Sequence, residues 1–309
     1  MSAAVIFEEY SAESGGREAL RRVSFSVSHG EVAALFGKAG AGKSTIALAL
    51  CGLQSSQSGV LRVLDRSVGR RSAAVQRGVS VGFQSPSYAP ELTAQETLDL
   101  QAALWRIPRK KRVGRVAYLA HLLGLEALQR TRARELSYGQ RIVLEIARAL
   151  LPEAPVTALD GLLDTLDPDL RNKLIRHVFE VARGEKRAFL IGTGNSEIAE
   201  LCDKVILLDA GSVLAQGPPE ELRTRVPDEV VVVQSVDNPA LRRRISERFR
   251  VAVREENGEM RFSLPNGDLA AAEILSEMDA QVSCVKVRPR TLHDVVDSFT
   301  EPGPEGGRQ

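Results

Sequence analysis

The chain has 309 residues, and 41 basic side chains against 40 acidic ones leave a formal net charge of +1. This length suggests about two domains at roughly 150 residues each, and a hydrophobic content of 43% excludes a mainly disordered chain. The near-neutral charge argues against a protein that binds nucleic acid through bulk positive charge, so we expect no nucleic-acid partner.

Short apolar runs alternate with longer helical patterns over residues 1–225, which predicts an α/β domain. Several of the apolar runs contain no polar residue, as is typical of strands in a parallel sheet covered on both faces. The predicted strands are Val5–Tyr10, Val23–Val27, Val32–Phe36, Val60–Leu64, Val79–Phe83, Val156–Leu159, Ala188–Ile191, Val205–Leu208 and Val213–Ala215.

The strand pattern stops between Phe83 and Val156. Apolar spacing near 3.6 predicts helices over Thr93–Leu104 and Val113–Leu123 in this interval. We therefore expect a parallel-sheet core interrupted by a helical insert at about residues 86–154.

A second, smaller domain is predicted at 226–300, after a change in composition near Val226-Pro227. Asn257-Gly258 between two short strands predicts a hairpin. The order β-α-β-β-α-β is that of a ferredoxin-like unit, and the Pro- and Gly-rich tail at 301–309 is expected to be disordered. The elements predicted here are the strands Glu229–Gln234, Val251–Glu255, Met260–Leu264 and Val282–Val287, and the helices Pro239–Phe249, Leu269–Met278 and Thr291–Phe299.

A glycine-rich segment at 37–45 lies between a predicted strand and an apolar helical run, and fits the pattern G-x-x-x-x-G-K-[ST] of a phosphate-binding loop. Glycines let the backbone close around phosphates, Lys43 neutralises their charge, and Ser44 offers a hydroxyl to Mg²⁺. The nucleotide-binding residues predicted here are Gly37, Lys38, Ala39, Gly40, Ala41, Gly42, Lys43, Ser44 and Thr45.

Two further segments carry candidate chemistry. Leu136–Arg141 opens a predicted helix that runs to Leu151, and Ser137 and Gly139 lie where a helix start donates to a phosphate. An ordinary N-cap is the alternative for this segment. Further along, an apolar strand ends in Asp160, and such a carboxylate can hold Mg²⁺ beside a phosphate loop.

The order and spacing of these motifs over residues 1–225 resemble the ATP-binding subunits of ABC transporters. The resemblance rests on the phosphate loop, Phe83-Gln84, the Leu-Ser-Tyr-Gly-Gln segment, the strand ending in Asp160, and Leu166-Asp167. A shorter segment, Pro289–Val295, is similar to the ending of drug- and antibiotic-exporter ATPases of the daunorubicin-resistance type.

The resemblance implies ATP and Mg²⁺ as cofactors, with Ser44, Gln84 and Asp160 around the metal. It also implies that Gln84 links the site to the membrane subunit, and that two such domains dimerise head-to-tail. Each ATP then contacts the signature of the other chain, here Ser137, Tyr138, Gly139 and Gln140.

An aromatic ring near the start of the chain is a further candidate for the nucleotide site. Tyr10 is predicted either to stack on adenine, since aromatic faces bind bases, or to be an ordinary edge-strand tyrosine.

Two positions depart from the family pattern. Gly161 stands where the family has the Glu that activates the attacking water, and Gly194 stands where it has a His that holds the γ-phosphate. Glycine has no group that orients water or accepts a proton, so we assign no catalytic residue. Asp164 is interpreted as the cap of the helix that starts around Pro168, and replacement of the missing base by Asp164 or Asp167 is the alternative.

The favoured function is the ATP-binding subunit of an ABC exporter, bound to transmembrane permease subunits at the cytoplasmic face of the cell membrane. Its own site is expected to bind Mg-ATP but hydrolyse it weakly, while its signature completes the site of a second ABC ATPase chain. The alternatives are a slowly hydrolysing homodimer and a soluble ATP-sensing regulator. No apolar run approaches the ~18 residues of a membrane span, and three cysteines without metal spacing fit a reducing cytosol.

Overall fold

The computed structural model describes residues 2–68, 77–85, 88–225, 229–235, 238–256, 258–277 and 282–300. The chain divides into two compact units, residues 1–219 and 220–309. The predicted boundary at Val226-Pro227, Asn257 of the predicted hairpin turn, and the tail at 301–309 lie outside the described residues.

Unit 1 is built on a six-stranded sheet with the order β10-β9-β3-β8-β7-β6, in which every neighbouring pair is parallel except β10 with β9. This confirms the predicted α/β core with a parallel sheet. All five side chains of β3 are buried, because helices cover both faces of the sheet. The strands are β3 (Val32–Phe36), β6 (Val79–Phe83), β7 (Val156–Asp160), β8 (Ala188–Thr193), β9 (Lys204–Asp209) and β10 (Ser212–Gly217).

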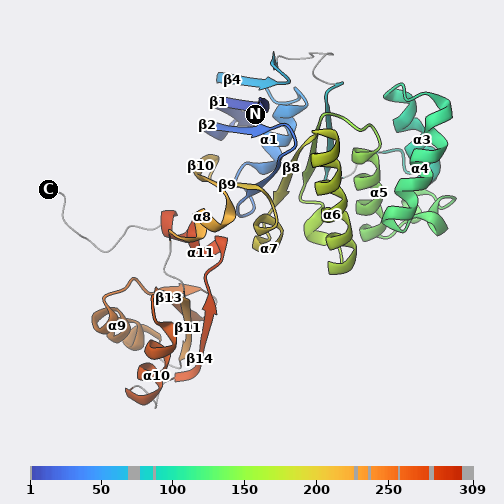
Figure 1. Ribbon diagram of the computed structural model, residues 1–309. Coiled ribbons are helices and arrows are strands. Elements are labelled where there is room, and N and C mark those ends of the chain that lie inside the picture. Colours follow the sequence, from blue (N-terminus) through green and yellow to red (C-terminus); the bar gives the residue numbers. More distant parts are fainter. Residues whose placement is uncertain are drawn as a thin grey trace. The chain divides into compact units, whose positions relative to one another are not determined.

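A second sheet of unit 1 is antiparallel, with the order β2-β1-β4-β5. Helix α1 (Lys43–Leu50) packs between the two sheets, as Figure 1 shows, and Ile46, Ala49 and Leu50 join a core with both of them. The strands of this sheet are β1 (Ala3–Ser14), β2 (Arg17–Ser28), β4 (Ser58–Val63) and β5 (Arg66–Ser67).

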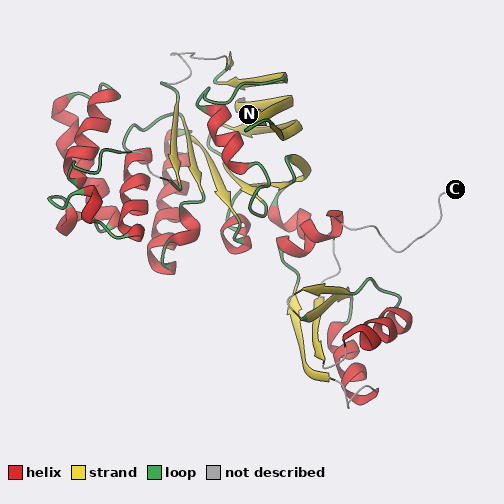
Figure 2. Ribbon diagram, turned by 180° about the vertical axis from the view of Figure 1, so that it is seen from behind, coloured by secondary structure: helices red, strands yellow, loops and turns green. Residues whose placement is uncertain are grey.

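Helices α5, α6 and α7 cover the other face of the parallel sheet, and α3 and α4 pack outside them. The segment between β6 and β7 is helical, as predicted, and Figure 2 shows it as a group of helices. Among the described residues, none of the helices is both long enough and apolar enough to cross a membrane. These helices are α3 (Ala94–Leu104), α4 (Arg109–Leu123), α5 (Tyr138–Leu150), α6 (Pro168–Glu185) and α7 (Ser196–Glu200).

Unit 2 contains an antiparallel sheet with the order β12-β13-β11-β14. In chain order this is the 4-1-3-2 arrangement of a split β-α-β unit, which agrees with the predicted ferredoxin-like topology. Helix α8 (Pro219–Arg223) spans the point at which the chain passes from unit 1 into unit 2. The other elements are β11 (Glu229–Ser235), α9 (Asn238–Phe249), β12 (Arg254–Glu256), β13 (Glu259–Leu264), α10 (Gly267–Glu277), β14 (Val282–Pro289) and α11 (Leu292–Thr300).

The start of α11 is held by a network around Asp294. Its carboxylate accepts two hydrogen bonds of 2.8 Å from Arg288, one of 2.7 Å from the Thr291 N–H and one of 2.8 Å from the Thr291 hydroxyl. Burial raises the pKa of Asp294, but these hydrogen bonds outweigh it and hold the pKa below the usual value. The Thr-Leu-x-Asp segment is therefore a helix start clamped to β14.

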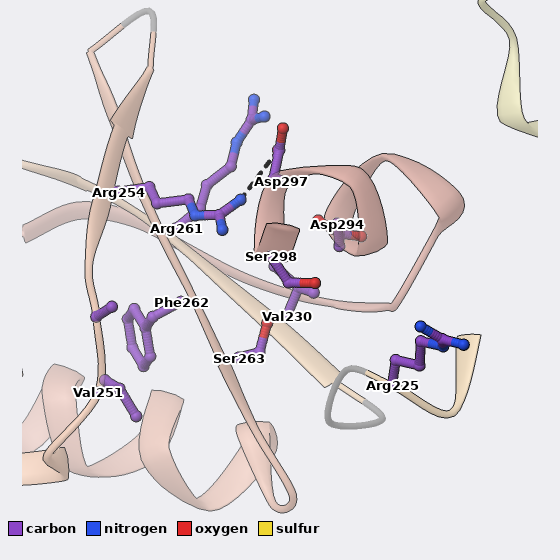
Figure 3. A pocket seen from close by; sticks show the side chains of 11 residues that line it. Arg225, Val230, Val251, Arg254, Arg261, Phe262, Ser263, Asp294, Asp297 and Ser298 are labelled. Carbon is purple, nitrogen blue, oxygen red and sulfur yellow. Dashed lines mark ion pairs between the residues drawn. The ribbon is translucent and has the colours of Figure 1, made fainter. Parts of the chain in front are cut away.

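A cavity of about 230 Å³ lies beside α11 in unit 2. Figure 3 shows its charged wall, where Arg254 of β12 forms an ion pair of 3.2 Å with Asp297 of α11. Asp294, which also lines this cavity, is bound by Arg288. Both acidic side chains in this wall therefore join α11 to the sheet.

Candidate functional site

The predicted site residues of unit 1 follow the carboxyl ends of four neighbouring strands. The phosphate loop follows β3, Gly194 follows β8, Asp160 ends β7, and Gln84 follows β6. Because these strands are parallel and adjacent, segments far apart in the sequence meet at one edge of the sheet. A cavity of about 610 Å³ opens there, lined by Glu18, Ala19, Arg21, Gly37, Ala39, Gly40, Gly42, Lys43, Ser44, Thr45, Gln84, Asp160, Gly161, Asp164, Gly194 and Ala210.

The phosphate loop depends on close backbone approach at its first residue. A Cβ at Gly37 would lie 2.2 Å from the carbonyl oxygen of Leu208, so no larger residue fits without moving the backbone. Lys43 is the first residue of α1, and its Nζ donates to the carbonyls of Gly37 at 2.6 Å and Lys38 at 2.9 Å. The ammonium is thus held over the loop, at the N-terminus of a helix, where a phosphate is stabilised.

Burial lowers the pKa of Lys43, and the carboxylates of Asp160 and Asp164 oppose that shift. Burial likewise raises the pKa of Asp160, which is only 7% exposed, while a hydrogen bond with Ser44 and the charge of Lys43 act in the other direction. These side chains are therefore close enough to share one charge network.

The same residues fit a magnesium nucleotide. Mg²⁺ prefers oxygen ligands and usually takes one or two from the protein and the rest from water and phosphates. Ser44 and Asp160 offer a hydroxyl and a carboxylate side by side. In the described part of the chain, no three His, Cys, Asp or Glu side chains are grouped to hold a metal by themselves. The phosphate oxygens of the nucleotide would therefore complete the coordination.

The two glycines that replace the expected Glu and His differ in their surroundings. Gly161 has φ +67°, and a Cβ there would lie 3.4 Å from the Gln84 side chain. The left-handed backbone itself favours glycine at this position. At Gly194, a Cβ would meet only Asp164 Oδ2 at 3.9 Å and the Gly37 carbonyl at 3.7 Å. Both distances are ordinary van der Waals contacts, so a Cβ is tolerated at 194 and what is missing there is a functional group.

The interpretation of Asp164 as a helix cap was wrong. Helix α6 is capped by Asp167, whose Oδ1 accepts from the Leu170 N–H at 2.9 Å. Pro168 is the signal that could have found this, because proline favours the first helical position and so places the cap at the residue before it.

Asp164 instead faces the cavity. Its Oδ1 accepts a hydrogen bond from the Thr193 hydroxyl, and its Oδ2 accepts one of 2.9 Å from the Gly194 N–H. The site therefore contains a second carboxylate beside the strand end that lacks the histidine.

The suggestion that Tyr10 stacks on adenine was also wrong. Tyr10 is only 2% exposed, belongs to the core between the sheets, and packs edge-on against Phe7 with ring centroids 5.3 Å apart. Its hydroxyl donates to the Gln54 carbonyl at 3.3 Å. A ring enclosed in this way cannot present a face to a base, because both faces already pack against protein. The alternative prediction, an ordinary edge-strand tyrosine, is correct in giving Tyr10 a structural role but wrong about the strand, because β1 lies between β2 and β4 in its sheet.

The signature segment forms the start of α5 and does not line the cavity of its own chain. Ser137 Oγ accepts from the Gln140 N–H at 3.2 Å, and the Gln140 side chain accepts from the Ser137 N–H at 2.8 Å. This reciprocal pair is a capping box. Tyr138 is 51% exposed, so the segment is available at the surface of the isolated chain.

Comparison with known proteins agrees with this fold. The ABC transporter family profile matches residues 20–163. Nod factor export ATP-binding protein I of Rhizobium sp. (strain N33) is 32% identical over 210 residues, 67% of this chain and 68% of that protein. The methionine import ATP-binding protein MetN of Clostridium tetani (strain Massachusetts / E88) is 28% identical over 221 residues, 70% of each chain.

A solved structure of an ATP-binding subunit of an ABC transporter is similar to this chain at 26% identity, with a TM-score of 0.67. It covers 72% of this chain and 92% of its own. The chain therefore belongs to the ABC transporter family, as one of its ATP-binding proteins.

Proposed function

We propose that this chain is the ATP-binding subunit of an exporter, that its own site binds Mg-ATP but hydrolyses it slowly, and that its signature completes the site of a partner ATPase. One observation carries the proposal. The cavity gathers Lys43, Ser44, Asp160 and Gln84, which hold a nucleotide, beside glycines at the two positions from which water would be activated.

Slow hydrolysis follows from the chemistry of the cavity. Loss of a general base costs about 10²–10⁴ in rate, and loss of a group that stabilises developing charge adds to this. Neither Gly161 nor Gly194 carries such a group. ATP binding needs only the loop, the lysine and the metal ligands, so binding and turnover are separable in this site.

The exporter assignment and the partners rest on resemblance. The Thr-Leu-x-Asp segment that opens α11 is similar to the ending of drug-exporter ATPases, and one relative is named as an export protein while another is named as an import protein. We propose transmembrane permease subunits and a second ATPase chain as partners, with this chain peripheral to the cytoplasmic face of the membrane.

The first experiment separates binding from turnover in the purified chain. Nucleotide affinity is measured by fluorescence and turnover by phosphate release, and we expect affinity with turnover far below the ~10 s⁻¹ typical of enzymes. The variant G194H tests whether a missing group limits the rate, because a Cβ at position 194 would meet its neighbours only at ordinary van der Waals distances. Turnover near the typical value in the unaltered chain would refute slow hydrolysis.

The second experiment asks which site the signature serves. In the complex reconstituted with its partners, S137A should reduce ATPase activity severely, while D160N should leave most of it. The variant T93A is the matched control, because Thr93 caps α3 through the same kind of box with Glu96. Equal and severe loss in S137A and D160N would mean that this chain's own site carries the turnover.

A slowly hydrolysing homodimer is the second candidate, and Asp164 favours it. Its carboxylate lines the cavity beside Gly161 and Gly194, where a base would stand. In this case D164N would abolish the residual phosphate release of the purified chain and leave ATP affinity within about twofold. Unchanged release in D164N would remove the observation that favours this candidate.

A further inference from the structure

The cavity has two chemically different ends. Lys43, Ser44 and Asp160 define the end at which phosphates bind. Glu18, Ala19 and Arg21 of β2 also line the cavity. A nucleoside triphosphate anchored by its phosphates must extend its base away from Asp160. Among the described residues that line the cavity, none is aromatic. The base must therefore meet a different kind of side chain.

A β-bulge in β2 directs Arg21 outward. Tyr10 pairs with Val23 and Ala12 pairs with Leu20, so Ser11 of β1 stands opposite two residues, Arg21 and Arg22. Strict alternation would place Leu20 and Val23 on opposite faces, but the extra residue lets both enter the core. Both arginines then point away from that core.

The backbone connects Arg21 to the phosphate loop through one intermediate residue. The Arg21 N–H donates to the Gly211 carbonyl at 2.8 Å, and the Gly211 N–H donates to the Ala41 carbonyl at 3.2 Å. A Cβ at Gly211 would lie 2.5 Å from the Ala19 carbonyl, so the turn and β2 are in close contact. The backbone position of Arg21 relative to the phosphate loop is thereby fixed before a ligand binds.

The two arginines of the bulge have different surroundings. The Arg21 side chain is 55% exposed, and its Nε lies 3.3 Å from Glu18 Oε2, which orients the guanidinium from one edge. Arg22 forms an ion pair with Glu9 and does not line the cavity. Exposed ion pairs such as these contribute little to stability, so the bulge is not explained by them.

We propose that Arg21 is the base-contacting residue of this site, stacking its guanidinium plane on the purine of a nucleoside triphosphate, an inference that rests on the proposed function. The guanidinium is planar and cationic and stacks on aromatic faces. Every purine presents such a face, so stacking does not distinguish adenine from guanine. The site therefore takes ATP and GTP with affinities within about fivefold of each other, because it holds the base by its face alone.

The experiment compares ligands with and without a base on the full-length chain. Binding of Mg²⁺ complexes of ATP, GTP and inorganic tripolyphosphate is measured by calorimetry. We expect R21A to lower the affinity for ATP and for GTP by about 5- to 150-fold, the range for loss of base stacking. The affinity for tripolyphosphate should stay within about twofold of that of the unaltered chain. The variant R21Y should restore ATP affinity, because an aromatic ring also stacks. The variant R22A, which removes the same charge one residue away, should leave the affinities for all three ligands unchanged.

Three results would overturn the inference. Unchanged ATP affinity in R21A would exclude contact with the base. Equal weakening of ATP and tripolyphosphate would mean that Arg21 acts through its charge on the phosphates. Failure of the unaltered chain to bind either ligand would refute the proposed function together with this inference, whereas the first two results leave the proposed function intact.

Discussion

Replacing Lys43 by alanine should remove most of the thermal stabilisation that ATP gives to unit 1. Lys43 Nζ contacts the loop carbonyls at 2.6 and 2.9 Å, in the position from which it would meet a phosphate. Removing a charge-assisted contact of ~3 kcal/mol raises Kd about 100-fold. ATP at about 100 times the Kd of the unaltered chain would then stand near the Kd of the variant.

The expected shifts in Tm follow from the linkage between ATP binding and folding. Ligand at about 100 Kd stabilises the folded state by ~2.7 kcal/mol, and ligand at Kd by ~0.4 kcal/mol. Unit 1 spans residues 1–219, and in a unit of that size each kcal/mol moves Tm by about 2–4 °C. We therefore expect ATP to raise Tm by about 5–11 °C in the unaltered chain and by about 1–2 °C in K43A.

Differential scanning fluorimetry of both proteins, with and without Mg-ATP, measures these shifts. The variant K43A without ATP reports the structural cost of losing the two carbonyl contacts, which we expect to be about 1 kcal/mol. The control is K173A, at an exposed position on α6. An ATP-induced shift in K43A equal to that of the unaltered chain would refute the assignment of the phosphate loop.

Further predictions concern the N-caps of α5 and α3, the close backbone contact at Gly37, and the start of α11. S137A and T93A should each destabilise the isolated chain by about 1 kcal/mol, because each removes one N-cap. Chemical denaturation measures this cost, and a much smaller cost in both variants would contradict the capping boxes. G37A should lower Tm by several degrees, because its Cβ would lie 2.2 Å from a carbonyl oxygen. D294N should speed hydrogen exchange of the α11 amides at pH 7. The pKa of Asp294 is lowered in the folded state. The stabilisation that its ionised carboxylate gives to the folded state is therefore present above the unfolded pKa and lost as pH falls through the folded pKa. The difference between D294N and the unaltered chain should vanish below that value, and a difference that persists there would contradict the clamp.

The sequence by itself determined the parallel core and the phosphate loop. Strands β3 and β6 begin and end at the predicted residues, because short apolar strands buried on both faces carry a pattern that needs no knowledge of their neighbours. The loop at 37–45 is contiguous, so its preceding strand, its glycines and its following helix are all local features. The ferredoxin-like order of unit 2 could be predicted for the same reason, because it follows from local features of the sequence.

The tertiary structure alone decided which side chains face the cavity at the carboxyl ends of the parallel strands. Asp164 meets the Gly194 N–H only because β7 and β8 are neighbours in the sheet, which no local pattern encodes. Tyr10 is enclosed because of one extra residue in β1, where Glu8 and Glu9 stand opposite Ser24, and Arg21 is exposed because of one extra residue in β2. A shift of one residue in strand register exchanges the buried and exposed faces, so these outcomes depend on pairing between strands and not on the residues themselves.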